Sequence, residues 1–141
     1  AQLHDESDEL ISQLYFLKGS STSRLGQLNQ AEAEVGRAIE LNPADGSYLA
    51  ERGRIRVHLE NFDGAFADLT RAVQLQPDWG PAFCNLGMVR TRLGDKENAI
   101  HDFDRALELD PRDFSALLNR GVIWLEMGQK ENAFHDFGRA L

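Results

Sequence analysis

The sequence predicts an all-α fold built from antiparallel helix pairs, and an internal repeat carries this prediction. Prolines recur with a period of 34, at Pro43, Pro77 and Pro111, and each follows a segment with the apolar spacing of a helix. Small residues recur with the same period in three further columns: Gly19, Gly53, Gly87 and Gly121; Ala31, Ala65, Ala99 and Ala133; and Ala38, Ala72, Ala106 and Ala140. Four columns that share one period indicate an array of short helical units.

Each repeat contains two helical patterns joined by a short turn. In the third repeat the apolar positions of these patterns are Phe83, Leu86, Val89 and Leu93, then Ala99, Phe103, Ala106 and Leu107. A glycine follows the first pattern at Gly26, Gly94 and Gly128, where a helix C-terminus favours a left-handed residue. The second repeat instead has Glu60 followed by Asn61, so we expect Asn61 to take the left-handed conformation in a slightly shifted turn.

This pattern resembles the tetratricopeptide repeat (TPR). The third unit is the closest match, because FCNLGMVRTRLGDKENAIHDFDRALELDP has apolar residues, small residues and a proline where the family has them. The resemblance implies a right-handed α-solenoid of about 3.5 to 4 helix pairs. The units that it predicts are residues 12–45, 46–79, 80–113 and a partial fourth at 114–141, preceded by an acidic lead-in at 1–11.

Composition restricts the class of partner. The chain has 141 residues, 42% of them apolar, and a net charge of −8, so it can form a core but lacks the basic face that a nucleic acid requires. The longest apolar runs, such as residues 122–125, are too short for membrane insertion. The single cysteine, Cys84, cannot form an internal disulfide and leads us to expect a cytoplasmic protein.

The resemblance also implies a binding surface on the first helix of each unit. It assigns the second, fifth, sixth, ninth, twelfth and thirteenth positions of a unit to the concave face, and we call these positions the groove columns. The candidate peptide-binding residues in them are Arg24, Ala50, Glu51, Arg54, His58, Cys84, Asn85, Met88, Arg92, Leu118, Asn119 and Val122. Apolar patches mixed with separate polar groups suit an extended or helical peptide. Arg24, Arg54 and Arg92 with His58 would favour an acidic ligand, or would have structural or solvated roles.

One binding mode of the family is not expected. The carboxylate clamp that holds the C-terminal tails of chaperones uses Lys, Asn and Arg at set groove positions. In this chain those positions hold Phe16, Ser20, Glu51, Pro81 and Asn85.

A second binding mode is matched in part. Asn85 and Asn119 occupy the sixth position of successive units, which is similar to the asparagine ladder in the TPR domain of O-GlcNAc transferase. An asparagine amide can hydrogen-bond both the N–H and the C=O of an extended peptide. Leu17 and Glu51 interrupt this ladder in the first two units.

Another pattern predicts ion pairs inside the hairpins. In three units a basic residue stands one position before the glycine column, and an acid follows it sixteen residues later: Lys18 and Glu34, Arg52 and Asp68, Arg120 and Asp136. We expect each pair to bridge the two helices of its hairpin. The third unit has Leu86 at this position, so we expect Asp102 to lack such a partner.

The repeated segments HDFDRAL and HDFGRAL raise the question of a catalytic or metal site. His101 and Asp102 are adjacent on a helix, which turns them about 100° apart and prevents them from facing each other. The sequence has no HExxH, GxSxG or phosphate-loop signature. We therefore expect no catalytic residue, no cofactor and no metal, and we expect His101 and His135 to face solvent. Cys84 is either a reactive thiol or, as we expect, a small apolar residue of the groove.

Together these patterns predict a non-catalytic protein–protein interaction module, an adaptor or scaffold that binds a peptide segment, acidic or extended, in its concave face. Two alternatives stay open. One is a structural module that self-associates through its uncapped ends, the C-terminal end above all, or through its concave surface. The other is the targeting domain of a larger enzyme.

Overall fold

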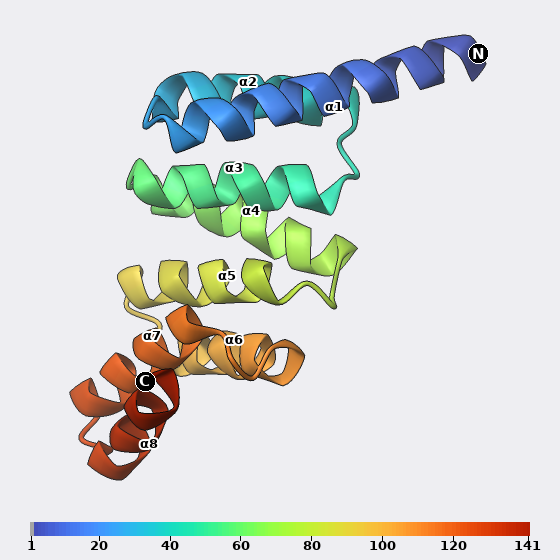
Figure 1. The fold of residues 1–141 in the computed structure, drawn as a ribbon. Helices are drawn as coiled ribbons and strands as arrows, with labels where there is room; N and C mark the ends of the chain where they lie inside the picture. Colours follow the sequence, from blue (N-terminus) through green and yellow to red (C-terminus); the bar gives the residue numbers. More distant parts are fainter. Residues whose placement is uncertain (1) are drawn as a thin grey trace. The chain divides into compact units, whose positions relative to one another are not determined.

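The chain folds into a series of helical hairpins (Figure 1). The computed structural model describes residues 2–141, with side chains from Glu6 onward. Over this range its helices are α1 (Gln2–Arg24), α2 (Leu28–Leu41), α3 (Gly46–His58), α4 (Phe62–Leu75), α5 (Gly80–Arg92), α6 (Lys96–Leu109), α7 (Phe114–Glu126) and α8 (Lys130–Ala140). Each odd-numbered helix pairs with the next even-numbered one. The predicted all-α fold of antiparallel helix pairs is confirmed.

The hairpins are grouped into two compact units, one that ends at Gln76 and one that begins at Pro77. Within the first unit α2 packs on α3, and within the second α6 packs on α7. Each hairpin thus buries apolar surface against its neighbour in the same unit, as in a repeat array. Helix α1 starts well before the predicted first hairpin and includes most of the predicted acidic lead-in (Figure 1).

The glycine columns set the distance between the two helices of a hairpin. A Cβ added to Gly87 of α5 would lie 2.7 Å from Cε1 of Phe103 on α6. One added to Gly53 of α3 would lie 2.6 Å from Cγ of Leu69 on α4. Such contacts are shorter than carbon atoms allow, so the large side chain of the second helix fits only because the first helix has glycine opposite it.

The cores follow the predicted columns. In the second unit the largest fully buried side chain is Phe103, which packs among residues of α6 and α7: Ala99, Ile100, Ala106, Leu107, Ala116, Leu117 and Ile123. In the first unit Ala31 and Val35 of α2 pack against Ile55 of α3. The alanines of both columns are fully buried except Ala140 at the end of α8, which is half-buried. A larger residue at the buried positions would push the helices apart.

The turns inside the hairpins use a left-handed residue. Three glycines have positive φ as predicted, 81° at Gly26, 86° at Gly94 and 77° at Gly128. At the second turn the prediction for Asn61 is wrong, because Glu60 has the positive φ, of 60°, and Asn61 has a φ of −86°. Asn61 is the N-cap of α4, and its Oδ1 accepts a hydrogen bond from the N–H of Gly64 at 3.1 Å. The capping role holds Asn61 outside the left-handed region, so the residue before it makes the turn.

Replacing Glu60 by glycine is expected to stabilise the protein by about 0.5–1 kcal/mol, since the relief of a left-handed conformation that disfavours any Cβ exceeds the extra entropy that glycine loses on folding. Urea-induced unfolding measures the change. The reciprocal control, Gly94→Glu, is expected to lower the stability. A Glu60→Gly variant that is no more stable than the wild type would contradict the assignment of this turn.

Candidate peptide-binding face

The groove columns lie on α1 and α3 in the first unit and on α5 and α7 in the second (Figure 1). Within each unit these two helices touch, so each unit presents a strip of two neighbouring helices. The candidate residues divide by exposure: Arg24, His58, Arg92 and Val122 are exposed, Glu51, Arg54, Asn85, Met88, Leu118 and Asn119 are half-buried, and Ala50 and Cys84 are buried. All but Ala50 and Cys84 therefore reach the surface.

Arg54 is engaged by neighbouring side chains. Its Nε and Nη2 donate to the two carboxylate oxygens of Glu51 at 3.1 and 2.8 Å, and Nη2 also donates to Oγ of Ser23 on α1 at 2.9 Å. The hydrogen bond to Glu51 raises the pKa of the guanidinium and shows that the two charges compensate each other. Arg54 would therefore attract an acidic ligand more weakly than an arginine without a partner would.

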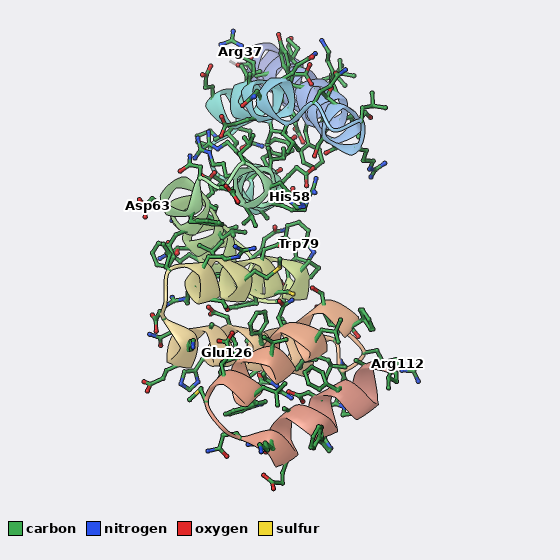
Figure 2. All side chains as sticks on the ribbon, turned by 90° about the vertical axis from the view of Figure 1, so that its left-hand side faces the viewer. Arg37, His58, Asp63, Trp79, Arg112 and Glu126 are labelled. Carbon is green, nitrogen blue, oxygen red and sulfur yellow. The ribbon has the colours of Figure 1, made fainter. Side chains whose placement is uncertain are left out.

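His58 of the first unit also has a local partner. Nδ1 of His58, the last residue of α3, lies 2.9 Å from the carbonyl oxygen of Arg54, and Figure 2 labels this residue beside α3. Because a carbonyl oxygen only accepts, Nδ1 carries the proton.

Phe16 of α1 stacks on Tyr48 of α3 with ring centroids 4.8 Å apart, and the hydroxyl of Tyr48 lies 3.3 Å from Oγ of Ser12. This aromatic contact was not predicted from the sequence, and it fixes α1 against α3.

Cys84 is a buried thiol of the second unit. Its side chain is 5% exposed, and burial raises its pKa to about 11, with a smaller contribution from the charge of Asp113. A thiol with this pKa is protonated at neutral pH and is a poor nucleophile. Cys84 therefore packs as a small apolar residue.

The outward side of α7 carries an uncovered apolar stripe. Leu118, Val122 and Leu125 follow helical spacing, and Val122 and Leu125 are 47% and 44% exposed. Glu126 at the end of the stripe forms an ion pair of 2.9 Å with Lys96 at the start of α6, and its label in Figure 2 marks this position. The stripe on α7 is consequently apolar, and Lys96 compensates the charge of the acid nearest to it.

The asparagines of the predicted ladder lie beside this stripe on α5 and α7. Nδ2 of Asn119 donates to the carbonyl oxygen of Ser115 at 2.8 Å and lies 3.2 Å from its Oγ. The amide nitrogen is thus engaged within α7, while the amide oxygen is left to accept from a ligand.

The predicted bridges inside the hairpins are confirmed. Arg52 binds Asp68 through two hydrogen bonds of 2.8 Å, and Arg120 binds Asp136 through hydrogen bonds of 2.8 and 2.6 Å. The third bridge is looser, with Nζ of Lys18 3.6 Å from Oε1 of Glu34. Paired contacts of this kind compensate the burial of Asp136, which is 1% exposed.

The prediction that Asp102 lacks a basic partner is wrong. Nε of Arg90, one helical turn beyond Leu86, lies 2.8 Å from Oδ2 of Asp102, although the N–H does not point at the oxygen as a hydrogen bond requires. Burial still dominates and raises the pKa of Asp102 to about 6, against the opposing attraction of Arg90. The third hairpin thus has a weaker bridge than the second or the fourth.

Further ion pairs, which the sequence did not reveal, join neighbouring hairpins within a unit. Nη1 of Arg120 donates to Oδ1 of Asp104 on α6 at 2.7 Å, and Nε of Arg56 donates to Oε2 of Glu32 on α2 at 2.8 Å. Most basic residues of the first helices are therefore bound to acids of the second helices.

The histidines of the repeated HDF segments face solvent as predicted, since His101 and His135 are exposed. Their aspartate neighbours point the other way, into the hairpins. Among the residues that the structure describes, no three His, Cys, Asp or Glu side chains gather as metal ligands would. Within the same range no helix combines the length and apolar character needed to cross a bilayer.

Comparisons with known proteins agree with this architecture. Two sequence models, both described as tetratricopeptide repeat, match residues 16–78 and 80–113. A crystal structure of MamA has a TM-score of 0.84 at 19% identity, over 92% of this chain and 75% of that one. The TPR domain of Arabidopsis OM64 has a TM-score of 0.82 at 26% identity, over 84% and 98%. The first TPR domain of Spaghetti (RPAP3), bound to the HSP90 peptide SRMEEVD, has a TM-score of 0.82 at 23% identity, over 85% and 95%.

Comparison with curated proteins gives no match. The hairpins, repeated at one fixed period, define a helical repeat protein that presents a strip of adjacent helices. The chain belongs to the tetratricopeptide repeat family, and its repeats make it a protein–protein interaction module.

The Arg120–Asp136 bridge is expected to show strong coupling in a double-mutant cycle with Arg120→Leu and Asp136→Asn. Removing Arg120 alone leaves a buried carboxylate without its main partner, so the coupling free energy should be about 1–3 kcal/mol. The exposed pair Arg37–Glu40, whose atoms lie 2.7 Å apart, is the matched control and should couple by less than about 0.5 kcal/mol. Additive effects at Arg120 and Asp136 in urea unfolding would contradict the bridge.

The raised pKa of Asp102 predicts a pH dependence. In the unfolded chain this carboxyl has its ordinary pKa of 3.8, so between about pH 4 and about pH 6 the folded state binds more protons than the unfolded state. The stability that Asp102 contributes therefore falls as the pH rises through this range. Asp102→Asn, which cannot ionise, should gain about 2 kcal/mol relative to the wild type between about pH 4 and about pH 7.

Urea unfolding at several pH values measures this difference, and Glu34→Gln provides the control of opposite sign. Although burial opposes it, hydrogen bonds from Thr22 and Gln30 hold the pKa of Glu34 below its usual value. Its contribution to stability is therefore lost as the pH falls, so Glu34→Gln should lose stability relative to the wild type as the pH rises. A difference between Asp102→Asn and the wild type that stays constant with pH would overturn the assignment.

Proposed function

We propose that the chain is an adaptor without catalytic activity that binds an extended peptide along its groove columns, with an apolar side chain of the peptide against α7. The observation that carries this proposal is the stripe of Leu118, Val122 and Leu125, of which Val122 and Leu125 are exposed and Leu118 is half-buried. Apolar side chains that lie together on a helix surface are a frequent property of interaction sites.

The polar groups around the stripe favour an extended ligand. Asn85 on α5 and Asn119 on α7 are half-buried, and each amide oxygen can accept an N–H of a peptide backbone. Contacts to the backbone give affinity without regard to sequence, while the apolar stripe selects a side chain. The chain would therefore recognise the peptide chiefly by its extended backbone and by one apolar side chain.

We infer that the ligand differs from the HSP90 peptide SRMEEVD to which the Spaghetti domain is bound. The clamp positions of this chain hold Phe16, Ser20, Glu51, Pro81 and Asn85, none of them basic. Arg54, the cation nearest in register, already binds Glu51. A C-terminal carboxylate would thus find no compensating charge at these positions.

Selection from a random-peptide display library with the full chain as bait tests the proposal, followed by fluorescence anisotropy of the selected peptides. Val122→Glu is expected to weaken binding by about tenfold or more, because a carboxylate would be buried under the ligand. Leu93→Glu, which alters a leucine 46% exposed outside the groove columns, is the matched control and should leave the affinity unchanged.

The peptide SRMEEVD serves as the second probe and is expected not to bind. The proposal would be overturned if Val122→Glu bound the selected peptides as tightly as the wild type. Binding of SRMEEVD with an affinity equal to that of the selected peptides would reject the inference on ligand chemistry.

A further inference from the structure

We propose that the third hairpin, formed by α5 and α6, is a proton-sensitive element that is held closed while Asp102 carries a proton and opens more readily once Asp102 ionises. The inference depends on three charged side chains, Arg90, Asp95 and Asp102, which we call the third-hairpin cluster. It goes beyond peptide binding, because none of the three lies in a groove column and the effect requires no ligand.

Each hairpin has an acid at one fixed column of its second helix, and the first helix supplies its hydrogen-bond donors in the first two hairpins. In the second hairpin Arg52 binds Asp68 through two hydrogen bonds of 2.8 Å, and Nη1 of Arg56, one turn further on, donates to the same carboxylate at 3.0 Å. In the first hairpin Oγ1 of Thr22 donates to Glu34 at 2.8 Å. Both acids are buried, and these donors compensate their burial.

The third hairpin lacks one of these partners. Leu86 stands in the column of Arg52 and is 2% exposed, so this position contributes apolar packing but no donor. Arg90 stands in the column of Arg56, and its Nε lies 2.8 Å from Oδ2 of Asp102 without the alignment of a hydrogen bond. This oxygen is buried and receives no hydrogen bond from any residue that the structure describes. The ionised form of Asp102 is therefore poorly compensated where it lies.

Asp95 competes with Asp102 for the same guanidinium. Nη1 of Arg90 lies 3.4 Å from Oδ2 of Asp95, so one cation stands between two carboxylates. Asp95 is the N-cap of α6 and accepts a hydrogen bond from Nδ2 of Asn98 at 2.8 Å, which keeps its carboxylate in place. Two ionised carboxylates beside one cation repel each other. When Asp102 binds a proton, Arg90 and Asp95 balance one to one and the repulsion disappears.

The charges around Asp102 set the pH range of the effect. Burial raises the pKa of Asp102 to about 6, and the charge of Asp95 adds to the rise, while Arg90 and His101 oppose it. Helix α7 also packs on α6, but its one basic residue, Arg120, is bound to two other acids, Asp104 and Asp136.

The direction of the effect follows from proton uptake. An opened hairpin exposes Asp102 to water, where its pKa returns toward its ordinary value of 3.8. Between about pH 4 and about pH 6 the closed hairpin consequently binds a proton that the open one releases, so opening becomes easier as the pH rises. The first unit has its own core, and an opening of the third hairpin therefore leaves it folded.

Amide hydrogen exchange on the full chain, from about pH 4.5 to about pH 7, measures the opening. Wild type and Asp102→Asn are compared at each pH, because the intrinsic pH dependence of exchange then cancels. The opening constant of the α5 and α6 amides in the wild type, relative to the variant, should rise about tenfold or more across this range. The amides of α2 and α3 should keep one ratio throughout.

A ratio that stays constant in α5 and α6 would overturn the proposal, because opening would then release no proton. An equal rise in α2 and α3 would also overturn it, because the proton would then be linked to unfolding of the whole chain.

Titration of the Asp102 carboxyl group, followed by NMR, tests the cluster without relying on Asp102→Asn. Asp95→Asn should lower the midpoint, because a like charge is lost, and Arg90→Met should raise it, because an attraction is lost. Leu86→Arg supplies the guanidinium that the second hairpin has at this column, so it should lower the midpoint and remove most of the pH dependence of exchange.

His101→Gln is the matched control, because imidazole side chains titrate in a neighbouring pH range. This variant should keep the pH dependence of exchange in α5 and α6. A dependence that vanishes in His101→Gln would assign the proton to the histidine and reject the proposal. A midpoint of Asp102 that neither Asp95→Asn nor Arg90→Met moves would reject the third-hairpin cluster as its cause.

Discussion

The close approach of the two helices in each hairpin is the constraint on which the rest of the structure depends. At Gly87 and Gly53 the opposite helix leaves no space for a Cβ, because Phe103 and Leu69 occupy it. Every hairpin must meet at this distance, so small residues recur at a fixed period and the large apolar side chains stand opposite them. The same contact fixes which sides of the first helix remain for neighbouring hairpins and which remain for a ligand.

The ion pairs follow from this geometry and determine the character of the binding surface. A residue one position before the close-contact glycine lies at the edge of the helix interface, where a charge needs a partner. Arg52 and Arg120 meet that need with Asp68 and Asp136, and Arg54, one position after the glycine, pairs with Glu51 on its own helix. These three arginines of the first helices are therefore compensated, which leaves the exposed apolar residues of α7 as the part of the surface without a local partner.

Most of the fold could be predicted from the sequence because the same helix–helix contact recurs in every hairpin, and its small and large residues therefore recur at one fixed period. The period shows which column holds an acid, but it does not show that a basic residue one turn away can reach that acid. For this reason the sequence did not reveal that Arg90, one turn beyond Leu86, pairs with Asp102. It also shows where a turn lies, but not whether Glu60 or Asn61 has the positive φ, which depends on the cap of α4. The engagement of Arg54 had a sequence signal, an acid three residues before it on one helix, whereas its contact with Ser23 requires the packing of α1 on α3.

The joints between neighbouring hairpins inside each unit combine an apolar cluster with an ion pair. In the joint between α6 and α7 Asp104 receives Arg120 beside the apolar cluster. An apolar contact alone discriminates poorly between partners, while a paired charge fixes register. The internal joints are thus specified by packing and charge together.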